Sequence, residues 1–467
     1  MRVHFVGIGG IGMSGIAQVL AGLGYQVSGS DLHPTSLTKK LEEQGIKVFA
    51  GHSAHHVDGA EMVVVSSAIP AANPEVLEAN ARKIPVVQRA EMLAFLMKSR
   101  FGIAVAGAHG KTTTTSMVAS ILEKAGKDPT VVIGGELTEL GHNAKLGQSE
   151  ILVAEADESD ASFLKLSPKI VVLTNIDADV NPSLGPYIPF NFDYEKTREH
   201  VEHVFLEFLK KVPTDGFAVL CSDCVNIKKI LNELSCSFLT YGLKEDAELN
   251  AREIKMEKNK SRFKVFLKGK PLGEIVLQVP GKHNVLNALG ALGVAIKLGI
   301  TFADAQAGLE SFQGVKRRFQ MIGEISDILV VDDYAHNPTK VKATLAAAKA
   351  AWGRRVVAVF QPHRYTRTKF LQTKFLDSFL DADLLILTEI YSAGENPLPE
   401  ITGVHFADDV KKAHPEKEIY FVESQEKAVD KLLEISKTGD MVITLGAGDV
   451  YRIGQAFFSR LKSVPAS

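Results

Sequence analysis

The sequence contains only three cysteines, and no apolar run in it is long enough to span a bilayer. Cys221, Cys224 and Cys236 cannot form a disulfide framework. The Cys221-x-x-Cys224 pair lacks the second pair that a zinc site needs, and Cys236 has no nearby histidine. Small apolar packing residues in a reducing compartment are the simpler interpretation. Residues 1–6 lead directly into a strand pattern without a signal peptide, so we expect a cytoplasmic protein.

An excess of charge is also missing. The 53 lysines and arginines nearly balance 55 acidic residues, and the formal net charge is −2. A global basic field that would attract nucleic acid or an anionic membrane is therefore absent. We expect no nucleic-acid partner and no membrane span, and any anion must be bound by local basic clusters.

The length of 467 residues predicts about three domains, and 45% hydrophobic residues provide material for several cores. The alternation of strand and helix patterns restarts near residues 101 and 316. We predict an α/β protein with a Rossmann-like domain at 1–100, a central P-loop ATPase-like domain at 101–315, and a C-terminal Rossmann-like domain at 316–467. Short alternating strands between residues 221 and 279 predict a small antiparallel extension of the central domain.

The first unit begins with an apolar strand and a glycine-rich turn, Gly7-Ile8-Gly9-Gly10-Ile11-Gly12. Asp31 follows a second strand, at about the place where a dinucleotide-binding fold has its ribose-binding acid. Taken alone, this pattern is typical of an NAD-binding fold. The glycine turn indicates that a pyrophosphate approaches the backbone, but it does not indicate whether nicotinamide lies beyond it.

The second unit begins with a buried strand at residues 101–106, followed by Gly107-Ala108-His109-Gly110-Lys111-Thr112-Thr113 and a helix. This order can place backbone N–H groups, a helix N-terminus and an ammonium around a polyphosphate, with the Thr112 hydroxyl free for Mg²⁺. The strict P-loop pattern has a glycine where this chain has Val105. The alternative is a glycine-rich turn followed by a solvated lysine.

Acidic residues follow the next strand of this unit. Residues 151–154 are apolar, and Glu155-Ala156-Asp157-Glu158-Ser159-Asp160 comes directly after them. An acid at the end of a strand near a phosphate loop is the Walker-B arrangement, and its purpose is to hold Mg²⁺. A solvated acidic turn is the alternative. A second group of polar residues, 174–179, follows the strand at 170–173. We call such a polar segment directly after a strand a polar tip.

Polar side chains also end the strands of the third unit, at residues 332–338, 361–367, 388–389 and 446–449. Ligands of open parallel sheets lie outside the carboxyl ends of the strands, so these tips predict a third ligand-binding face. Solvated loops are the alternative. His283, Asn284 and Asn287 lie at a helix start, where they could cap the helix or reach a ligand.

Three α/β units in this order, with the glycine turn, a Gly-x-x-Gly-Lys-Thr loop and an Asp-Tyr-x-His-x-Pro element, resemble the Mur ligases. These are the ATP-dependent amino-acid-adding enzymes of peptidoglycan assembly. The resemblance runs from about residue 2 to residue 455. The motifs that carry it are His4-Phe5-Val6-Gly7-Ile8-Gly9-Gly10-Ile11-Gly12-Met13-Ser14-Gly15, Val65-Ser66-Ser67-Ala68-Ile69, Glu155-Ala156-Asp157-Glu158-Ser159-Asp160, Gly281-Lys282-His283-Asn284 and Phe360-Gln361-Pro362-His363-Arg364-Tyr365-Thr366-Arg367.

The resemblance implies a ligase that joins L-alanine to the lactyl carboxylate of UDP-N-acetylmuramate. The carboxylate would attack the γ-phosphate of ATP, and the amine of L-alanine would displace phosphate from the resulting acyl phosphate. Mg²⁺, which Mn²⁺ can replace, would accompany the ATP. The protein would be a monomer or a homodimer. Catalysis would then consist largely of positioning and charge neutralisation.

The resemblance also implies the roles of individual residues. Those expected to be catalytic are Lys111, Glu155, His336 and Arg367, with Thr112 and Glu155 as metal ligands. Those expected to bind ATP are Gly107, His109, Gly110, Lys111, Thr112, Thr113, His283, Asn284, Asn287, Arg318 and Asp333. Those expected to bind the UDP-sugar or the amino acid are Gly9, Gly10, Gly12, Met13, Asp31, Ser66, Ser67, Ala68, Tyr334, His363, Arg364 and Arg367.

The chain departs from the pattern of these ligases at three positions. Ala108 stands where threonine is usual, and Asn337 where a second histidine is usual. Val180 stands where the ligases typically have a histidine that helps to bind a second Mg²⁺, and valine cannot be a ligand. Our hypothesis is that water or an oxygen ligand takes over this role. The candidate ligands are Asp177, Asp179, Asn181 and Asp193, and the loop at 181–193 is also longer than expected.

Three other functions remain open. An NAD-dependent oxidoreductase would explain residues 1–100 but would leave the Lys111 loop and the third unit without a role. A murein-recycling ligase that attaches a whole tripeptide to the same UDP-sugar shares the phosphate loop, although the element at 361–367 argues against it. A non-catalytic relative that binds the UDP-sugar is conceivable because of Val180.

Overall fold

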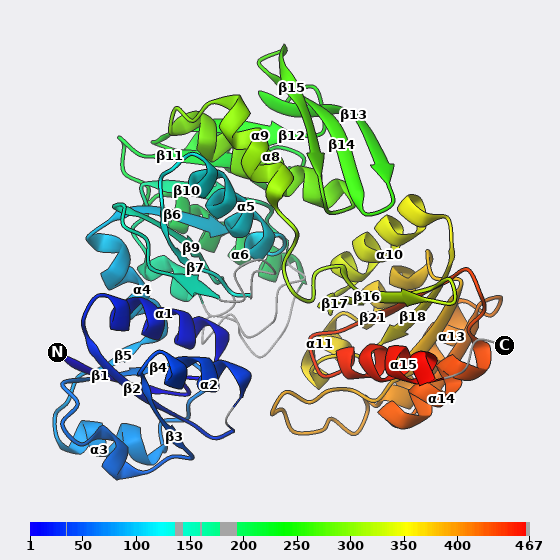
Figure 1. Cartoon of the computed structure of the whole chain (residues 1–467), viewed down its shortest axis with the longest axis horizontal. Coiled ribbons are helices and arrows are strands. Elements are labelled where there is room, and N and C mark those ends of the chain that lie inside the picture. The colour runs from blue at the N-terminus through cyan, green and yellow to red at the C-terminus, as the bar shows by residue number, and fades with distance from the viewer. Residues whose placement is uncertain (34, 136–142, 159–160, 178–193, 464–467) are drawn as a thin grey trace.

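The computed structural model describes all residues of the chain except 34, 136–142, 159–160, 178–193 and 464–467. Val180 and the loop at 181–193 therefore lie outside the described residues. Three α/β lobes follow one another along the chain, each with its own sheet, and the central lobe adjoins both of the others (Figure 1). This confirms the predicted three-domain α/β fold class.

The N-terminal sheet is entirely parallel, with the strand order β3-β2-β1-β4-β5. Its order reverses at β1, which is the strand that precedes the glycine turn, so this turn lies at the topological switch point where such sheets bind ligands. The elements are β1 (Arg2–Val6), α1 (Ile11–Gly22), β2 (Gln26–Asp31), α2 (Ser36–Glu43), β3 (Lys47–Ala50), β4 (Met62–Val65), α3 (Pro74–Ala81), β5 (Val86–Gln88) and α4 (Arg89–Lys98).

The central sheet has ten strands in the described part of the chain, in the order β15-β14-β13-β12-β11-β10-β6-β9-β7-β8. Strand β6, which precedes the phosphate loop, lies between β9 and β10, so the polar tips of all three strands meet at one edge. The strands are β6 (Phe101–Ala106), β7 (Thr130–Val132), β8 (Ala144–Lys145), β9 (Ile151–Glu155), β10 (Ile170–Leu173), β11 (Phe217–Cys221), β12 (Ser237–Gly242), β13 (Leu249–Glu257), β14 (Lys260–Leu267) and β15 (Lys270–Leu277). The helices are α5 (Lys111–Lys124), α6 (Tyr194–Leu209), α7 (Val225–Ile230), α8 (Lys282–Lys297) and α9 (Phe302–Ser311).

The antiparallel extension was predicted with the wrong starting point. Strand β12 pairs in parallel with β11, and β11 pairs in parallel with β10, so residues 221–242 continue the parallel sheet. Between residues 221 and 277, antiparallel pairing begins where β14 pairs with β13, and it continues from β14 to β15. A short strand-like pattern in the sequence does not specify the direction of the neighbouring strand.

The C-terminal sheet has the order β16-β17-β21-β18-β19-β20, and only β16 is antiparallel to its neighbour among the described strands. Separate apolar clusters cover its two faces. The strands are β16 (Gln320–Ile325), β17 (Ile328–Asp333), β18 (Arg355–Phe360), β19 (Leu384–Thr388), β20 (Glu418–Val422) and β21 (Asp440–Leu445). The helices are α10 (Pro338–Trp352), α11 (Tyr365–Phe370), α12 (Gln372–Leu376), α13 (Gly403–Ala413), α14 (Gln425–Ile435) and α15 (Tyr451–Ser463).

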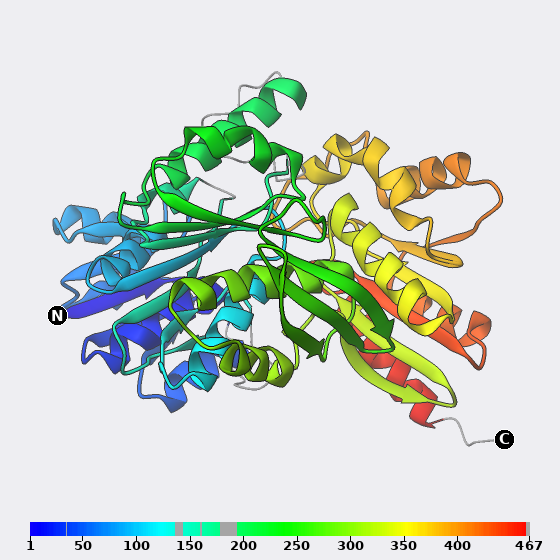
Figure 2. The ribbon, with the colours of Figure 1, turned by 90° about the horizontal axis from the view of Figure 1, so that it is seen from above.

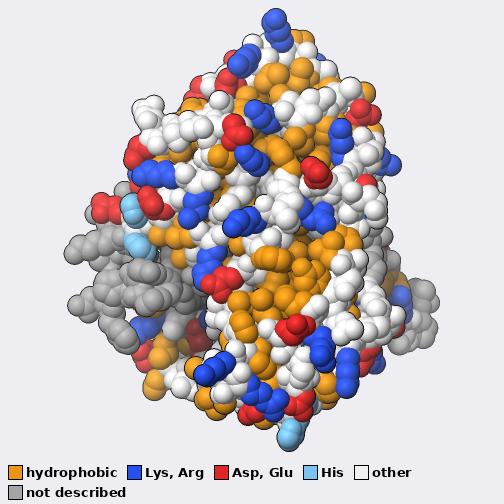
Figure 3. Space-filling view, turned by 90° about the vertical axis from the view of Figure 1, so that its left-hand side faces the viewer, with side chains coloured by type: hydrophobic (Ala, Val, Ile, Leu, Met, Phe, Trp, Pro, Cys, Tyr) orange, Lys and Arg blue, Asp and Glu red, His pale blue; other side chains and the backbone are white. Residues whose placement is uncertain are grey.

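The arrangement of the lobes places the carboxyl ends of the three sheets around one interior region. Seen from above, the C-terminal lobe lies beside the central lobe and meets it along α10 and the antiparallel strands (Figure 2). On the face shown in Figure 3, acidic and basic side chains are interspersed around apolar patches, so no field of a single sign covers that face. No helix among the described residues is long and apolar enough to cross a membrane.

Candidate functional site

The phosphate loop connects β6 to α5 and is held in shape by the tip of β10. Gly107 and Gly110 have φ values of +130° and +84°, and a side chain on Gly107 would collide with the Thr174 hydroxyl. Thr174 Oγ1 donates a hydrogen bond to the His109 carbonyl at 2.6 Å. Asn175 Oδ1 accepts one from the His109 N–H at 2.9 Å. The predicted polar tip of β10 therefore supports the loop.

Lys111 is the first residue of α5, and its ammonium has three oxygen partners. Nζ lies 2.7 Å from the Gly107 carbonyl oxygen and 2.9 and 2.6 Å from Oε1 and Oε2 of Glu158. Burial disfavours the charged form, but the carboxylates of Glu158 and Glu155 outweigh it and raise the pKa of Lys111. The lysine is therefore an ammonium at neutral pH, in position for an anion at the N-terminus of α5.

Thr112 and Glu155 form a set of oxygen donors that fits Mg²⁺. Thr112 Oγ1 donates a hydrogen bond to Glu155 Oε2 at 3.0 Å, and the Gly134 N–H donates to the same oxygen at 2.8 Å. Mg²⁺ prefers hydroxyl and carboxylate oxygens and usually retains waters. Within the described residues, no three His, Cys, Asp or Glu side chains are grouped as metal ligands. A cation at Thr112 and Glu155 would therefore also need oxygens from phosphate and water.

A cavity of about 410 Å³ lies between the phosphate loop, α8 and the C-terminal lobe. It brings together most of the residues expected to bind ATP, although they come from segments far apart in the chain. The expected residues that line it are His109, Gly110, Thr112, Thr113, His283, Asn284, Asn287, Arg318 and Asp333.

His283 and Asn287 have different roles in this cavity. Burial and the charge of Arg318 lower the pKa of His283 to about 4, so its ring is neutral at pH 7. A neutral ring is suited to contact the uncharged adenine of ATP. Asn287 Oδ1 accepts a hydrogen bond from Thr114 Oγ1 at 3.2 Å and lies against Gly110. Asn287 therefore supports the phosphate loop from the side of α8.

A second cavity, of about 970 Å³, lies at the junction of the three lobes. Thr112, Val315, Arg318 and Lys340 line both cavities, so the two are adjacent. The N-terminal lobe contributes the glycine turn, where α1 begins, and the C-terminal lobe contributes the tips of β17 and α11. The expected residues that line the second cavity are Gly10, Gly12, Met13, Ser66, Ser67, Ala68, Lys111, Thr112, Glu155, Arg318, Tyr334, His336 and Arg367.

Four residues expected to bind the substrates lie outside the lining of both cavities: Gly9, Asp31, His363 and Arg364. The Gly9 N–H donates to Asp31 Oδ2 at 2.9 Å, so Asp31 stabilises the glycine turn. Arg364 lies beside Glu395, with Nη1 3.5 Å from Oε1. His363 Nδ1 accepts a hydrogen bond from Arg367 Nη1 at 2.8 Å, and the His363 ring stacks on Tyr391.

The charges of the residues that follow β17 and β18 in the C-terminal lobe favour a negatively charged ligand. Burial and Arg367 lower the pKa of His363 to about 3, and burial and Lys340 lower that of His336 well below 6.5. Both rings are therefore neutral at pH 7. Burial also lowers the pKa of the Arg367 guanidinium to about 10, which leaves it charged. Arg367 is 8% exposed and retains donors for a carboxylate.

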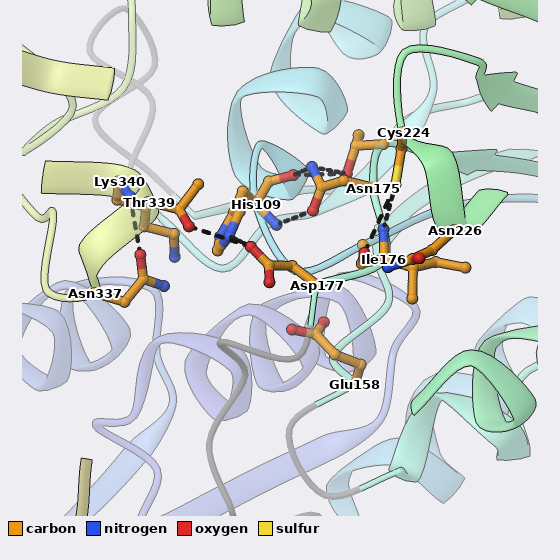
Figure 4. A network of polar contacts seen from close by, with 12 residues as sticks. His109, Glu158, Asn175, Ile176, Asp177, Cys224, Asn226, Asn337, Thr339 and Lys340 are labelled. Atoms are coloured by element: carbon orange, nitrogen blue, oxygen red, sulfur yellow. Dashed lines mark hydrogen bonds and ion pairs between the residues drawn. The ribbon is translucent and has the colours of Figure 1, made fainter. Parts of the chain in front are cut away.

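The structure adds two residues that the sequence alone did not single out, Arg89 and Lys340, and it gives the candidate metal ligand Asp177 two hydrogen-bond partners. Arg89, the first residue of α4, lies against Gly12 with Nη2 3.4 Å from Asp157 Oδ2, and both side chains line the second cavity. Asp177 Oδ2 accepts hydrogen bonds from His109 Nε2 at 3.0 Å and from Thr339 Oγ1 at 3.2 Å (Figure 4). Lys340 follows Thr339 and lines both cavities. Only the polar tip after β17 marked this last region in the sequence.

The comparisons with known proteins agree along the whole chain. Models of the Mur ligase family, catalytic domain, the Mur ligase middle domain and the Mur ligase, glutamate ligase domain match residues 2–101, 105–295 and 317–448. A UDP-N-acetylmuramate–L-alanine ligase from Geotalea daltonii is 53% identical over 464 residues, which are 99% of both chains. The corresponding protein from Geobacter sulfurreducens is 49% identical over 99% of this chain and 98% of its own.

Two solved structures resemble the whole molecule. The UDP-N-acetylmuramate-alanine ligase of Thermotoga maritima is 30% identical, with a TM-score of 0.82 over 99% of both chains. A murein peptide ligase from Psychrobacter arcticus is 25% identical, with a TM-score of 0.72 over the full length of both.

Proposed function

The chain belongs to the Mur ligase family, and we propose that it joins L-alanine to the lactyl carboxylate of UDP-N-acetylmuramate with ATP as the phosphoryl donor. The observation that carries the proposal is the cavity at the junction of the lobes. It places the glycine turn, the Lys111 loop and Arg367 around one space. Relatives that are 53% and 49% identical to this chain are named UDP-N-acetylmuramate–L-alanine ligase, whereas the murein peptide ligase is 25% identical.

The first step is phosphoryl transfer. A carboxylate oxygen of the sugar attacks the γ-phosphorus, the bond to the bridging oxygen of the β-phosphate breaks, and ADP leaves. Lys111 and the N-terminus of α5 neutralise charge on the phosphates. Bound Mg²⁺ would supply further positive charge, and Thr112 and Glu155 are the residues that would hold it.

The second step is attack of the alanine amine on the acyl phosphate, with release of phosphate. Arg367 is suited to hold the carboxylate of alanine because its planar guanidinium can form paired hydrogen bonds. His363 orients it by accepting the hydrogen bond from Nη1. His336, whose Nδ1 lies 2.8 Å from the Tyr334 carbonyl oxygen, is neutral and lines the same cavity.

The glycine turn of the N-terminal lobe receives the pyrophosphate of the UDP-sugar in this proposal. Backbone N–H groups at the start of α1 and the nearby guanidinium of Arg89 are suited to that group. The carboxylate of Asp31 is already hydrogen-bonded to the Gly9 and His33 N–H groups, which argues against a role on a nicotinamide ribose. The NAD-dependent oxidoreductase is therefore the weaker alternative.

Other expectations remain part of the proposal. We propose a domain division at 1–100, 101–315 and 316–467, a cytoplasmic location, and a monomeric or homodimeric state. At the second metal position, Asp177 is the candidate ligand that lies among the described residues, and it already accepts hydrogen bonds from His109 and Thr339.

Phosphate release from ATP tests the proposal. It is measured with and without UDP-N-acetylmuramate, and with L-alanine, glycine, L-serine or the murein tripeptide as acceptor. We expect release that requires the UDP-sugar and is fastest with L-alanine. Faster turnover with the tripeptide would favour the recycling ligase, and release that ignores both substrates would defeat the ligase assignment.

A further inference from the structure

Lys340 is held at the junction of the lobes by the start of α10. The Asn337 side chain caps this helix by accepting a hydrogen bond from the Lys340 N–H at 3.0 Å, and Pro338 occupies the first turn. Thr339 Oγ1 donates to Asp177 of the central lobe at 3.2 Å. Figure 4 shows Lys340 beside this contact, on the side of the C-terminal lobe. The backbone before the lysine is thus tied to the strand tip that supports the phosphate loop.

The surroundings of Lys340 contain more positive than negative charge. Lys111, Arg318 and Arg367 lie close enough to disfavour its ammonium, and Glu158 is the carboxylate that favours it. His109 and His336 also face it, and both are neutral at pH 7. Lys340 Nζ has no hydrogen bond or ion pair with any residue that the structure describes.

Lys340 lies among three other cations, and the carboxylates near those cations act mainly on them: Glu158 on Lys111, Asp333 on Arg318 and Glu395 on Arg367. A bound anion would relieve the repulsion that remains at Lys340. Glu158 is already paired with Lys111 at 2.6 Å, so little of its charge is left for the other three. The position also lies where the ATP cavity meets the cavity at the junction. A phosphoryl group that passes from a nucleotide in the first cavity to a carboxylate in the second would cross this position.

We propose that Lys340 is a catalytic residue of the phosphoryl transfer, with its ammonium on the transferring phosphate opposite Lys111. The proposal rests on the proposed function. The sugar carboxylate forms the new P–O bond, the bond to ADP breaks, and Lys340 neutralises the phosphoryl oxygens without giving or taking a proton. Because Lys340 belongs to the C-terminal lobe, this charge is next to the nucleotide only while that lobe contacts the central lobe, as it does through Thr339 and Asp177.

Lys340 could instead take a proton from the ammonium of L-alanine, and the two roles differ in the step that they affect. Bound ATP adds negative charge next to Lys340 and so favours its ammonium. An ammonium neutralises phosphate but cannot accept a proton. The charge role is therefore favoured, and the base role becomes an outcome of the test.

The test measures ADP formed in the first turnover by rapid quench, with ATP and UDP-N-acetylmuramate but without L-alanine. The variants are Lys340→Met, Lys340→Arg and, as a matched control, Lys342→Met on the exposed side of the same helix. We expect Lys340→Met to slow this step about 100-fold, the size of losing one donor to a developing oxyanion. Lys340→Arg retains most of the rate because it retains the charge, and Lys342→Met matches wild type.

Thermal unfolding of each variant separates chemistry from folding. Lys340→Met should unfold no earlier than wild type, because it replaces an ammonium that lacks a partner. A wild-type first-turnover rate in Lys340→Met, with or without loss of transfer to L-alanine, would overturn the assignment, and so would equal losses in the Met and Arg variants. An inactive wild-type enzyme would overturn the proposed function itself.

Discussion

The ammonium nitrogen of Lys111 lies 2.6 Å from Oε2 of Glu158, so the lysine that begins the helix of the phosphate loop is already paired with a carboxylate. Glu158 is buried, and burial raises its pKa although Lys111 opposes the change. An ATP phosphate that approaches Lys111 must therefore compete with Glu158. The ion pair neutralises the charge of Lys111 in the absence of nucleotide, and it lowers the affinity of the loop for phosphate.

Glu158→Gln should therefore bind ATP several-fold more tightly, because Lys111 no longer has to leave a carboxylate. The same change should destabilise the free protein by about 1–3 kcal/mol, since a buried ammonium loses its partner. Titration calorimetry with ATP and thermal unfolding measure the two effects. Glu150→Gln, an exposed position just before β9, is the control. Weaker ATP binding in Glu158→Gln would mean that Glu158 contributes to the nucleotide site directly.

Glu155→Gln tests the magnesium assignment. The amide can still accept hydrogen bonds from Thr112 and Gly134, but it has lost the charge that attracts a cation. We expect the Mg²⁺ concentration for half-maximal activity to rise about tenfold or more, as is usual when a metal site is weakened. An unchanged Mg²⁺ titration would remove Glu155 from the site. Chelation of Mg²⁺ in the wild type should abolish phosphate release.

The rate at limiting ATP should depend on a group that titrates near neutrality. Burial, Arg318 and Lys111 lower the pKa of Lys340 to about 7, whereas Glu158 opposes this. The group is active as an ammonium, so kcat/KM for ATP should fall as the pH rises through about 7. In Lys340→Arg the fall should move to higher pH because arginine keeps its proton. The same pH profile in wild type and Lys340→Arg would assign the titration to another group.

The N-terminal lobe contains a carboxylate whose contribution to stability depends on pH. Glu75 is completely buried; Ser30 Oγ lies 2.7 Å from its Oε2, His52 Nδ1 2.9 Å from the same oxygen and His56 Nδ1 2.6 Å from Oε1. Burial would raise its pKa, but contacts with His4 and hydrogen bonds from Ser30 and His56 lower it to about 2.

A carboxyl whose pKa is lower in the folded protein stabilises the fold above its unfolded pKa, which is 4.5 here. We therefore expect this stability, about 3 kcal/mol, to be lost as the pH falls from 4.5 to 2. Glu75→Gln should lower the free energy of unfolding by a similar amount at pH 7, and the difference from wild type should shrink in acid. Denaturant unfolding at several pH values measures both.

The buried strands β6 and β10 could be predicted because each is a short apolar run followed by glycine or polar residues. Both have the bounds that the sequence predicts, at residues 101–106 and 170–173. The polar tips could be predicted for the same reason, since the carboxyl ends of parallel strands share an edge. The parallel pairing of β12 could not, because a short strand-like pattern does not specify strand direction.

The contacts between the lobes could not be predicted from the sequence. Asp177 and Thr339 are 162 residues apart, and no local pattern specifies their hydrogen bond. In the sequence, Lys340 is an ordinary lysine in the first turn of a predicted helix. Its position between the two cavities is evident only from the packing of the C-terminal lobe against the central lobe. No local pattern indicates that Asp31, which is expected to bind a ligand, also accepts a hydrogen bond from the N–H of Gly9.

The fate of the lactyl carboxylate oxygens shows whether an acyl phosphate forms. UDP-N-acetylmuramate is labelled with ¹⁸O in its lactyl carboxylate and converted with ATP and L-alanine, and the released phosphate is analysed by ³¹P NMR. Attack of the carboxylate on the γ-phosphorus predicts one ¹⁸O atom in each phosphate and the other in the new amide. Phosphate without ¹⁸O, released at the rate at which the amide forms, would contradict an acyl phosphate and with it this account of the site.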